Sequence, residues 1–312
     1  MEYTKENARI VYMGTPEISA TVLRGLIEEG FNIVGVICNP DKPTGRKGTL
    51  TPCPVKLLAL EHGIPVFQPA KIRLEHDFLK ELDPDVIVTM AYGQIVPDAV
   101  LSCPVRGCVN LHGSLLPKLR GAAPIQRAID EGMSVTGVTL MEMVAKMDAG
   151  KMFDKIEVPI SEGENYTSLA SRIGLAARDL ILRDLLPYLN GEFPGEEQDE
   201  SEVTFAAKIL PEDEHLDFSW TREALLRRIR ALSLTPGGYA YLDGLKLKVY
   251  QASASDLPTG KPGEVVKARK GFFVSCLDGV VSLESVQLEG KKPTDGKSFV
   301  NGYRDLEGKI LS

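Results

Sequence analysis

Apolar residues recur in two alternating patterns along the first 190 residues. Short runs rich in β-branched residues predict strands at residues 8–14, 31–38, 64–69, 85–93, 108–113 and 135–144. Apolar residues at three- and four-residue spacing predict helices at residues 16–29, 55–63, 123–132 and 168–191. Strands that alternate with helices predict an α/β domain with an open, largely parallel sheet.

The first predicted helix carries recognisable start and stop signals. Thr15 is a candidate N-cap, Pro16 suits the first helical position, and Glu17 suits the positive end of the helix dipole. Gly30 is typical of the residue that follows a helix. The same segment, MGTPE, follows a strand but is not GxGxxG, so a dinucleotide-binding fold of the usual kind is weakly supported.

The second half of the chain changes in character. Residues 191–208 are polar and lack a periodic pattern, which predicts a linker. After a short helix within 215–233, Gly, Asp-Gly and Pro turns separate short strands expected at 237–242, 245–253, 263–269, 271–277 and 280–288. The chain is therefore expected to divide into an α/β domain at 1–190, the linker, and a small β-barrel or sandwich within 209–312.

Composition and charge narrow the class of protein. The chain has 312 residues, 43% of them hydrophobic, and a net charge of -7, which argues against a partner that is polyanionic over the whole surface. Residues 205–312 are mildly basic, with 16 Lys and Arg against 14 Asp and Glu. Five cysteines without metal-ligand spacing predict reduced thiols, no metal site and a cytoplasmic location. The sequence shows neither a signal peptide nor an apolar run long enough to span a membrane.

Candidate chemistry lies at the end of the strand predicted for 108–113. Asn110 and His112 are two apart, so a strand points both side chains to one side. An amide can stabilise an oxyanion, and an imidazole can move a proton near neutral pH. Asp148, in a Gly-bearing loop, is the candidate carboxylate partner, while the competing Glu142 lies within a strand. Taken alone, a His at a strand end is more often packed or solvated than catalytic.

Further motifs occur along the whole chain, before and after this candidate site. MGTPE, NPDKPTGRKG, TPCPVK, MAYGQIVP, NLHGSLLPKLRGAAPIQRAI and MDAG occur in this order. They resemble the methionyl-tRNA formyltransferases, a branch of the folate-dependent formyltransferase family, and the resemblance continues through TFAAKI and HLDFSW. An Asn-x-His with a later Asp is shared by all folate-dependent formyltransferases, whereas HGSLLPKLRGAAPIQ is far more specific to those that act on tRNA.

The resemblance implies an activity and its catalytic residues. The family transfers a formyl group from 10-formyltetrahydrofolate to the methionine amine of initiator methionyl-tRNA, without a metal. Its catalytic positions fall on Asn110, His112 and Asp148. Residues 1–190 would be a Rossmann-like catalytic domain, and 209–312 an OB-like domain that contacts tRNA. We expect a cytoplasmic enzyme that acts as a monomer.

The resemblance also assigns binding segments. The folate pocket is similar to a segment and a turn in this chain, namely Met90, Ala91, Tyr92 and Gly93, and Ser114, Leu115, Leu116 and Pro117. The family's loop that enters the tRNA acceptor arm matches 39–54, where the bases are Lys42, Arg46 and Lys47 and Arg46 is the main one. Basic residues that could face an anion in the second domain are Lys246, Lys248, Lys267, Arg269, Lys270, Lys291 and Lys292.

Departures from the family pattern and alternative functions remain. Val144, Ala149 and Lys151 replace the family's usual residues around Asp148, so the contacts of this loop are in doubt. A formyltransferase for a small amine, such as an amino-sugar nucleotide, is the main alternative. A nicotinamide oxidoreductase lacks its glycine motif here, and a non-catalytic RNA-binding module would not need the Asn-x-His and Asp set.

Overall fold

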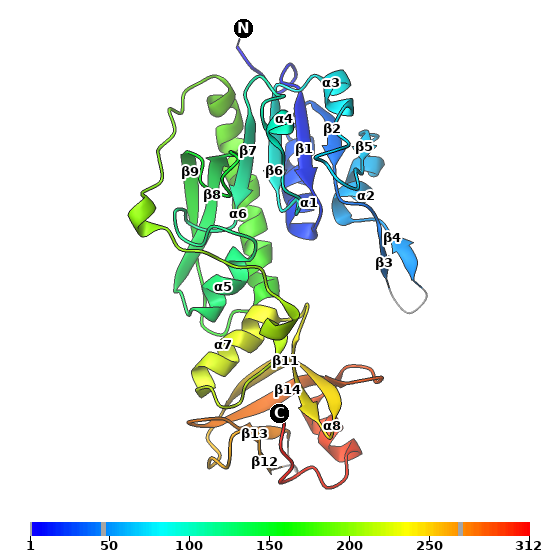
Figure 1. Ribbon diagram of the computed structural model, residues 1–312, viewed down its shortest axis with the longest axis vertical. Coiled ribbons are helices and arrows are strands. Elements are labelled where there is room, and N and C mark those ends of the chain that lie inside the picture. The colour runs from blue at the N-terminus through cyan, green and yellow to red at the C-terminus, as the bar shows by residue number, and fades with distance from the viewer. Residues whose placement is uncertain (1, 45–47, 268–270) are drawn as a thin grey trace. The chain divides into compact units, whose positions relative to one another are not determined.

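The computed structural model describes residues 2–44, 48–267 and 271–312 (Figure 1). Contacts between Cα atoms divide the chain into two compact units. The first unit contains residues up to 124, together with 135–159 and 170–206. The second unit contains residues 125–134, 160–169 and 207–312.

The first unit is built on a seven-stranded sheet in the order β5-β2-β1-β6-β7-β8-β9. The strands are β1 (Ile10–Gly14), β2 (Ile33–Ile37), β5 (Val66–Phe67), β6 (Val86–Met90), β7 (Cys108–His112), β8 (Val135–Glu142) and β9 (Met152–Pro159). The first five of these are mutually parallel, and β8 and β9 continue the sheet in antiparallel pairing. The expected open, largely parallel sheet is therefore confirmed.

Helices and a small hairpin lie between these strands along the chain, and a further helix follows β9. The helices are α1 (Glu17–Glu28), α2 (Pro54–Glu61), α3 (Phe78–Leu82), α4 (Asp98–Leu101), α5 (Pro124–Asp130) and α6 (Tyr166–Leu189). The hairpin consists of β3 (Lys42–Thr44) and β4 (Thr49–Thr51). Across the described residues, none of the helices is both long and apolar enough to cross a membrane.

Strand β1 shows why the sheet is covered on both faces. All five of its residues are buried. Val11 and Met13 pack in a cluster with Leu79 of α3 and Val100 of α4. The intervening Tyr12 points the other way, and its hydroxyl bonds to the main-chain oxygen of Ser19 in α1 at 2.8 Å. A continuous apolar run is the pattern of a strand buried on both faces.

Three local predictions need correction. Thr15 does not cap α1, because Pro16 occupies the cap position and the Thr15 hydroxyl instead bonds to Asn39 and Tyr92 beyond the ends of neighbouring strands. Strand β9 was not predicted, since its partly exposed residues give no clear apolar pattern. The loop expected at 39–54 contains the β3–β4 hairpin.

The second unit is an antiparallel β domain, as expected. Its sheet runs β10-β11-β14-β13-β12, with β15 paired to β14. The elements are α7 (Arg222–Leu232), β10 (Gly238–Leu242), β11 (Leu245–Ser255), β12 (Val265–Lys267), β13 (Phe273–Ser275), β14 (Val280–Leu288), β15 (Thr294–Asp295) and α8 (Gly296–Gly302). Short 3-10 helices, η1 (Glu200–Glu202) and η2 (Pro211–Glu214), lie before α7. The finer OB-like assignment stays a prediction.

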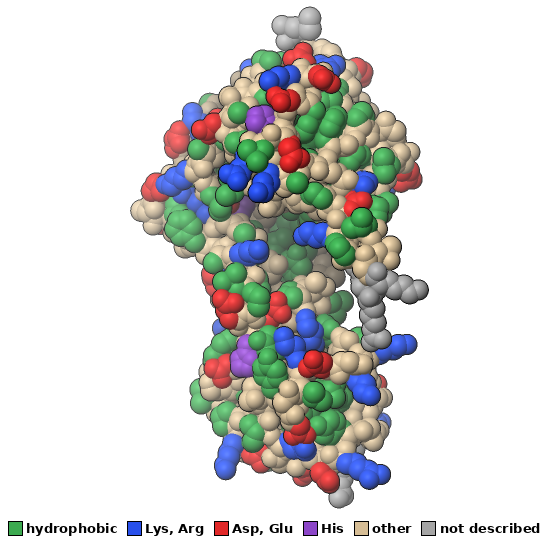
Figure 2. Space-filling view, turned by 45° about the vertical axis from the view of Figure 1, so that its right-hand side comes forward, with side chains coloured by type: hydrophobic (Ala, Val, Ile, Leu, Met, Phe, Trp, Pro, Cys, Tyr) green, Lys and Arg blue, Asp and Glu red, His purple; other side chains and the backbone are tan. Residues whose placement is uncertain are grey.

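Polar and apolar side chains alternate along β10 and β11. Ala240 and Leu242 are buried, whereas Tyr239 and Tyr241 lie on the outer face, which they share with Lys246 and Lys248 of β11. On the face drawn in Figure 2, the Lys and Arg side chains of the second unit are interspersed with Asp and Glu. On this face, the second unit is therefore a mosaic of charge rather than uniformly basic.

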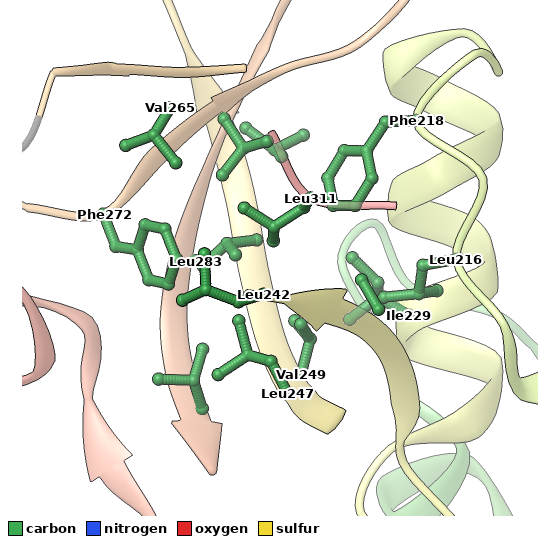
Figure 3. Close-up of a cluster of buried hydrophobic side chains, with 14 of the residues drawn as sticks. Leu216, Phe218, Ile229, Leu242, Leu247, Val249, Val265, Phe272, Leu283 and Leu311 are labelled. Carbon is green, nitrogen blue, oxygen red and sulfur yellow. The ribbon is translucent and has the colours of Figure 1, made fainter. Parts of the chain in front are cut away.

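The inner face of the sheet carries the core of the second unit (Figure 3). Residues of the strands meet those of α7 and of the segment before it, and Leu311 from the chain's last residues joins them. The labelled members are Leu216, Phe218, Ile229, Leu242, Leu247, Val249, Val265, Phe272, Leu283 and Leu311. Stacking of Phe272 on Phe299, with ring centroids 5.1 Å apart, attaches α8 to this core.

The two ends of α8 predict opposite responses to an added methyl group. A Cβ on Gly296 would lie 1.9 Å from the main-chain oxygen of Leu283, whereas a Cβ on Gly302 would meet nothing within 4 Å. Gly296→Ala should lower the free energy of unfolding by about 1–3 kcal/mol, and Gly302→Ala should leave it unchanged or raise it slightly. Urea unfolding followed by Trp220 fluorescence measures both, because this single tryptophan lies in the second unit. Equal effects of the two substitutions would contradict the assigned packing.

Candidate active site

The candidate site lies at the carboxyl end of the parallel strands. Asn110 and His112 are the third and last residues of β7, and Asn110 is in register with Thr89 of β6. Strand β6 also pairs with β1, where Gly14 is in register with Met90. The strand order reverses between β1 and β6, and open α/β sheets bind ligands beside such a switch point.

His112 is buried, with 5% of its side chain exposed, and both ring nitrogens face protein oxygens. Nε2 lies 2.8 Å from the carbonyl oxygen of Leu119. Because a carbonyl can only accept, Nε2 carries a proton and donates. Nδ1 lies 3.6 Å from Oδ2 of Asp148, so it is the nitrogen at which a further proton can be held. The structure thus brings the expected His and Asp together.

Asp148 reaches the imidazole from the loop after β8. Its backbone is in the left-handed region, with φ of 50°. Its Oδ2 accepts a hydrogen bond of 2.9 Å from the main-chain N–H of Gly121. The competing Glu142, the last residue of β8, is in register with Val109 and forms no ion pair with His112 among the described residues.

The Asn110 side chain is half-buried and free to act on a ligand. No hydrogen-bond partner for its amide is found in the described part of the chain. It shares one side of β7 with His112, while Leu111 between them is buried. An amide donor and an imidazole paired with a carboxylate therefore lie together.

The turn after β7 is held by hydrogen bonds within the first unit. The Thr139 hydroxyl donates to the carbonyl of Ser114 at 2.7 Å and accepts from the N–H of Leu116 at 3.1 Å. Ser114 is buried and donates to the carbonyl of Lys118, and Leu116 is buried in a cluster with two methionines. Of the four residues expected to bind folate here, Leu115 and Pro117 are the ones that remain partly exposed.

Buried and exposed residues also alternate at the end of β6 and just after it. Met90 and Tyr92 are buried, while Ala91 and Gly93 are exposed and adopt positive φ angles of 50° and 89°. The Tyr92 hydroxyl has no hydrogen-bond partner in the described chain, and burial raises the pKa of this phenol. A ligand beside β7 would therefore meet the backbone of Ala91 and Gly93 rather than the Tyr92 hydroxyl.

The segment expected to bind tRNA is described in part. Lys42 is exposed at the start of β3, whereas Arg46 and Lys47 lie outside the described residues. Arg269 and Lys270 of the second unit also lie outside them, as does the Lys267 side chain. At the base of the hairpin, Lys56 pairs with Asp41 at 2.7 Å and holds the pKa of that carboxyl below its usual range.

Two buried polar residues beside the site were missed by sequence reasoning. Arg120, with 1% of its side chain exposed, donates from Nε to Oε1 of Gln198 at 2.9 Å. Gln198 in turn donates from Nε2 to the main-chain oxygens of Asp148 and Gly150, both at 2.8 Å. Gln198 stands in an acidic, aperiodic stretch, which gives no sequence signal of burial.

Metal-ligating groups are not gathered at this site. Among the residues that the structure describes, no cluster of three or more His, Cys, Asp or Glu side chains could hold a metal ion. All five cysteines are free thiols, and Cys38, Cys108 and Cys276 are buried.

Comparison with known proteins defines the class to which this fold and site belong. The formyl transferase family model matches residues 8–185, and the model of the formyl transferase C-terminal domain matches residues 208–304. The protein is therefore a formyl transferase in class, with both characteristic parts present.

Individual relatives refine this class. The methionyl-tRNA formyltransferase of Bacillus subtilis (strain 168) is 44% identical over 308 residues, covering 97% of each chain. The chain belongs to the methionyl-tRNA formyltransferase family.

Solved structures share the fold at low identity. HypX from Aquifex aeolicus in complex with tetrahydrofolic acid aligns with a TM-score of 0.70 and 17% identity over 98% of this chain, which spans 51% of that protein. The N-formyltransferase from Helicobacter canadensis, in complex with folinic acid and dTDP-3-aminofucose, aligns with a TM-score of 0.66 and 17% identity, covering 88% of this chain and 98% of that one.

Two threonines of β8 predict how much the turn depends on its hydroxyl support. Thr139 makes two hydrogen bonds to the turn, whereas Thr136, equally buried, has a hydroxyl without a partner among the described residues. Thr139→Val should lower the free energy of unfolding by about 1–3 kcal/mol because two buried main-chain groups lose their partner. Thr136→Val should be neutral or stabilising. Scanning calorimetry compares them, and an equal loss in both would show that the turn does not rely on Thr139.

Proposed function

We propose that this protein transfers the formyl group of 10-formyltetrahydrofolate to the amino group of methionine on initiator methionyl-tRNA. The observation that carries the proposal is the His112–Asp148 pair beside the unengaged amide of Asn110. These groups lie at the carboxyl edge of the sheet, where open α/β proteins bind ligands. The 44% identity to a methionyl-tRNA formyltransferase along the whole chain supports the choice of substrate.

Asn110 is suited to the charge that formyl transfer creates. Attack of the amine on the formyl carbon places negative charge on the formyl oxygen, and a fixed N–H donor stabilises that charge as it develops. The amide of Asn110 has no protein partner in the described chain, so it can donate to the substrate without breaking an existing bond. The donor substrate supplies a formyl group that is already activated by its nitrogen leaving group.

His112 and Asp148 are suited to moving the proton that the reaction must relocate. The amine loses one proton as its new bond to carbon forms, and the folate nitrogen gains one as its bond to carbon breaks. The Nε2 atom of His112 is committed to the carbonyl of Leu119, so Nδ1 is the atom that takes up and returns this proton. Asp148, 3.6 Å away, stabilises the resulting imidazolium.

Folate binding is proposed for the two segments that flank β7. Ala91 and Gly93 are exposed at the end of β6, and Leu115 and Pro117 are partly exposed in the turn after β7. Main-chain groups in these segments can bond to a pterin ring without displacing buried side chains. The buried neighbours Met90, Tyr92, Ser114 and Leu116 would then act by holding the backbone in place.

Contact with tRNA is proposed for the 39–54 segment and for the outer face of β10 and β11. Lys42 is exposed in the first region. In the second, Lys246 lies 3.8 Å above the ring centroid of Tyr239, and a cavity of about 440 Å³ is lined by Tyr241, Lys246 and Lys248, among others. Basic side chains beside aromatic rings suit RNA, because the basic groups can bind phosphates and the rings can stack on nucleobases. Binding should weaken steeply with salt.

The remaining expectations also belong to this proposal. Residues 1–190 would be the catalytic domain and 209–312 an OB-like domain for tRNA. The 191–208 stretch expected to be a linker joins them along the chain, but its residues up to 206 belong to the first unit. The family-model matches at 8–185 and 208–304 support a division of this kind. A cytoplasmic monomer is the form in which we expect the enzyme to act.

Substitution of each catalytic candidate should lower turnover and spare tRNA affinity. Asn110→Ala removes an oxyanion donor and should reduce kcat by about 100- to 1,000-fold. His112→Ala and Asp148→Ala remove proton transfer and should reduce kcat by about 100-fold or more. Filter binding of charged tRNA should stay within about threefold of the unaltered protein. Near-normal turnover in any one variant removes that residue from the mechanism.

A substrate comparison tests the proposed function directly. Formyl transfer from 10-formyltetrahydrofolate should be fast to initiator methionyl-tRNA and slow to elongator methionyl-tRNA, as measured by transfer of a labelled formyl group from the folate to each acceptor. An amino-sugar nucleotide serves as the small-amine control. Transfer to the sugar and not to tRNA would replace the proposal with the alternative acceptor, and transfer to neither would reject a formyltransferase of either kind.

A further inference from the structure

Gln198 is a buried amide that contacts the loop of Asp148 at two points. It is 8% exposed, and its Nε2 donates to the main-chain oxygens of Asp148 and Gly150, each at 2.8 Å. Asp148 has a φ of 50°, a left-handed conformation that is uncommon for residues other than Gly, Asn and Asp. The two hydrogen bonds of Gln198 therefore fix the direction of the backbone from Asp148 to Gly150.

The other end of the same amide reaches the loop that orients His112. Oε1 of Gln198 accepts from Nε of Arg120 at 2.9 Å. Leu119, just before Arg120, accepts the hydrogen bond of His112, and Gly121, just after it, donates to the carboxylate of Asp148. One amide therefore joins the two loops whose relative position sets the distance between the imidazole and the carboxylate.

The main chain near Gln198 reinforces this connection. The N–H of Arg120 donates to the carbonyl of Thr204 at 2.9 Å, and the N–H of Ala206 donates to the carbonyl of Arg120 at 2.7 Å. The Thr204 hydroxyl also accepts from the N–H of Leu119 at 2.9 Å. Residues 198–206 thus line the loop 119–121 along its length, although their composition predicts a linker.

We propose that Gln198 is a positioning residue for formyl transfer, which fixes Asp148 and the 119–121 loop so that His112 and Asp148 meet at the working distance. The proposal rests on the function proposed above. An amide is required, because only an amide supplies two N–H donors to the carbonyls and an oxygen acceptor to Arg120. A carboxylate in its place keeps the contact to Arg120 but repels the carbonyls of Asp148 and Gly150.

Two substitutions of Gln198 test this role. Gln198→Glu retains the acceptor for Arg120, and Gln198→Met fills a similar volume without hydrogen bonding, so that at least one variant is expected to fold. In both, kcat for formyl transfer should fall about 100-fold, the effect of misplacing a catalytic group by about 1 Å. KM for tRNA and for the folate donor should stay within about threefold.

Asn190 offers a matched control in the same unit. Its side-chain amide accepts from the N–H of Tyr3 at 2.8 Å and donates to the carbonyl of Tyr3 at 3.1 Å, so it too bonds the main chain in both directions. Asn190→Asp makes the same chemical change as Gln198→Glu, away from the candidate site. It should leave kcat per folded molecule within about twofold of the unaltered protein.

Hydrogen–deuterium exchange supplies a readout that does not depend on activity. Peptides covering 118–124 and 145–151 should exchange faster in both Gln198 variants and unchanged in Asn190→Asp. Unchanged exchange and unchanged kcat in a folded Gln198 variant would overturn the proposal. A fall in activity no larger than the fall in the folded fraction would also overturn the proposal, because kcat per folded molecule would then be unchanged, as expected for Asn190→Asp. An unaltered protein that is inactive on tRNA, while the variants still show faster exchange, would reject the proposed function and keep the positioning role.

Discussion

The hydrogen bond from Nε2 of His112 to the carbonyl of Leu119 is the contact on which the geometry of the site depends. A buried carbonyl that can only accept commits one ring nitrogen, so the other is the site where a proton can be added. That nitrogen faces Asp148. Strand β7 positions the ring, but the carbonyl determines which of its nitrogens is left to face Asp148.

The geometry of the site depends on the backbone conformation of the loops around His112 and Asp148. Leu119 and Asp148 both have positive φ angles, 59° and 50°, although neither is a glycine. Such conformations are unfavourable for residues with a Cβ and persist only where neighbouring contacts hold them. Gly121, in the same loop as Leu119, has a φ of 126°, and a Cβ there would lie 2.6 Å from the carbonyl oxygen of Ala206. The two loops and residues 198–206 therefore constrain one another.

Much of the fold could be predicted from local pattern, and the reason is burial. Strands β1 and β6 are largely apolar and buried throughout, so each can be predicted from its own residues without the rest of the chain. Strand β9 is partly exposed, so its residues lack a clear apolar pattern and it was not predicted. Thr15 was misassigned because its hydroxyl serves contacts to residues 24 and 77 positions away rather than the adjacent helix. The shared side of Asn110 and His112 follows from strand geometry. The sequence offered Asp148 only as a candidate in a Gly-bearing loop, and the family resemblance placed it in the same set. Gln198 donates to a carbonyl 50 residues earlier in the chain, and the residues around Gln198 give no sign of this contact.

The position of Gln198 has a consequence for dividing the chain into working pieces. A fragment cut where the polar stretch begins, near residue 190, would contain every catalytic candidate yet lack the segment that holds two of them in place. The shortest autonomous fragment should instead extend to Ala206, whose N–H closes the last of these bonds. In this protein the boundary suggested by composition lies near residue 190, whereas the first compact unit extends to residue 206.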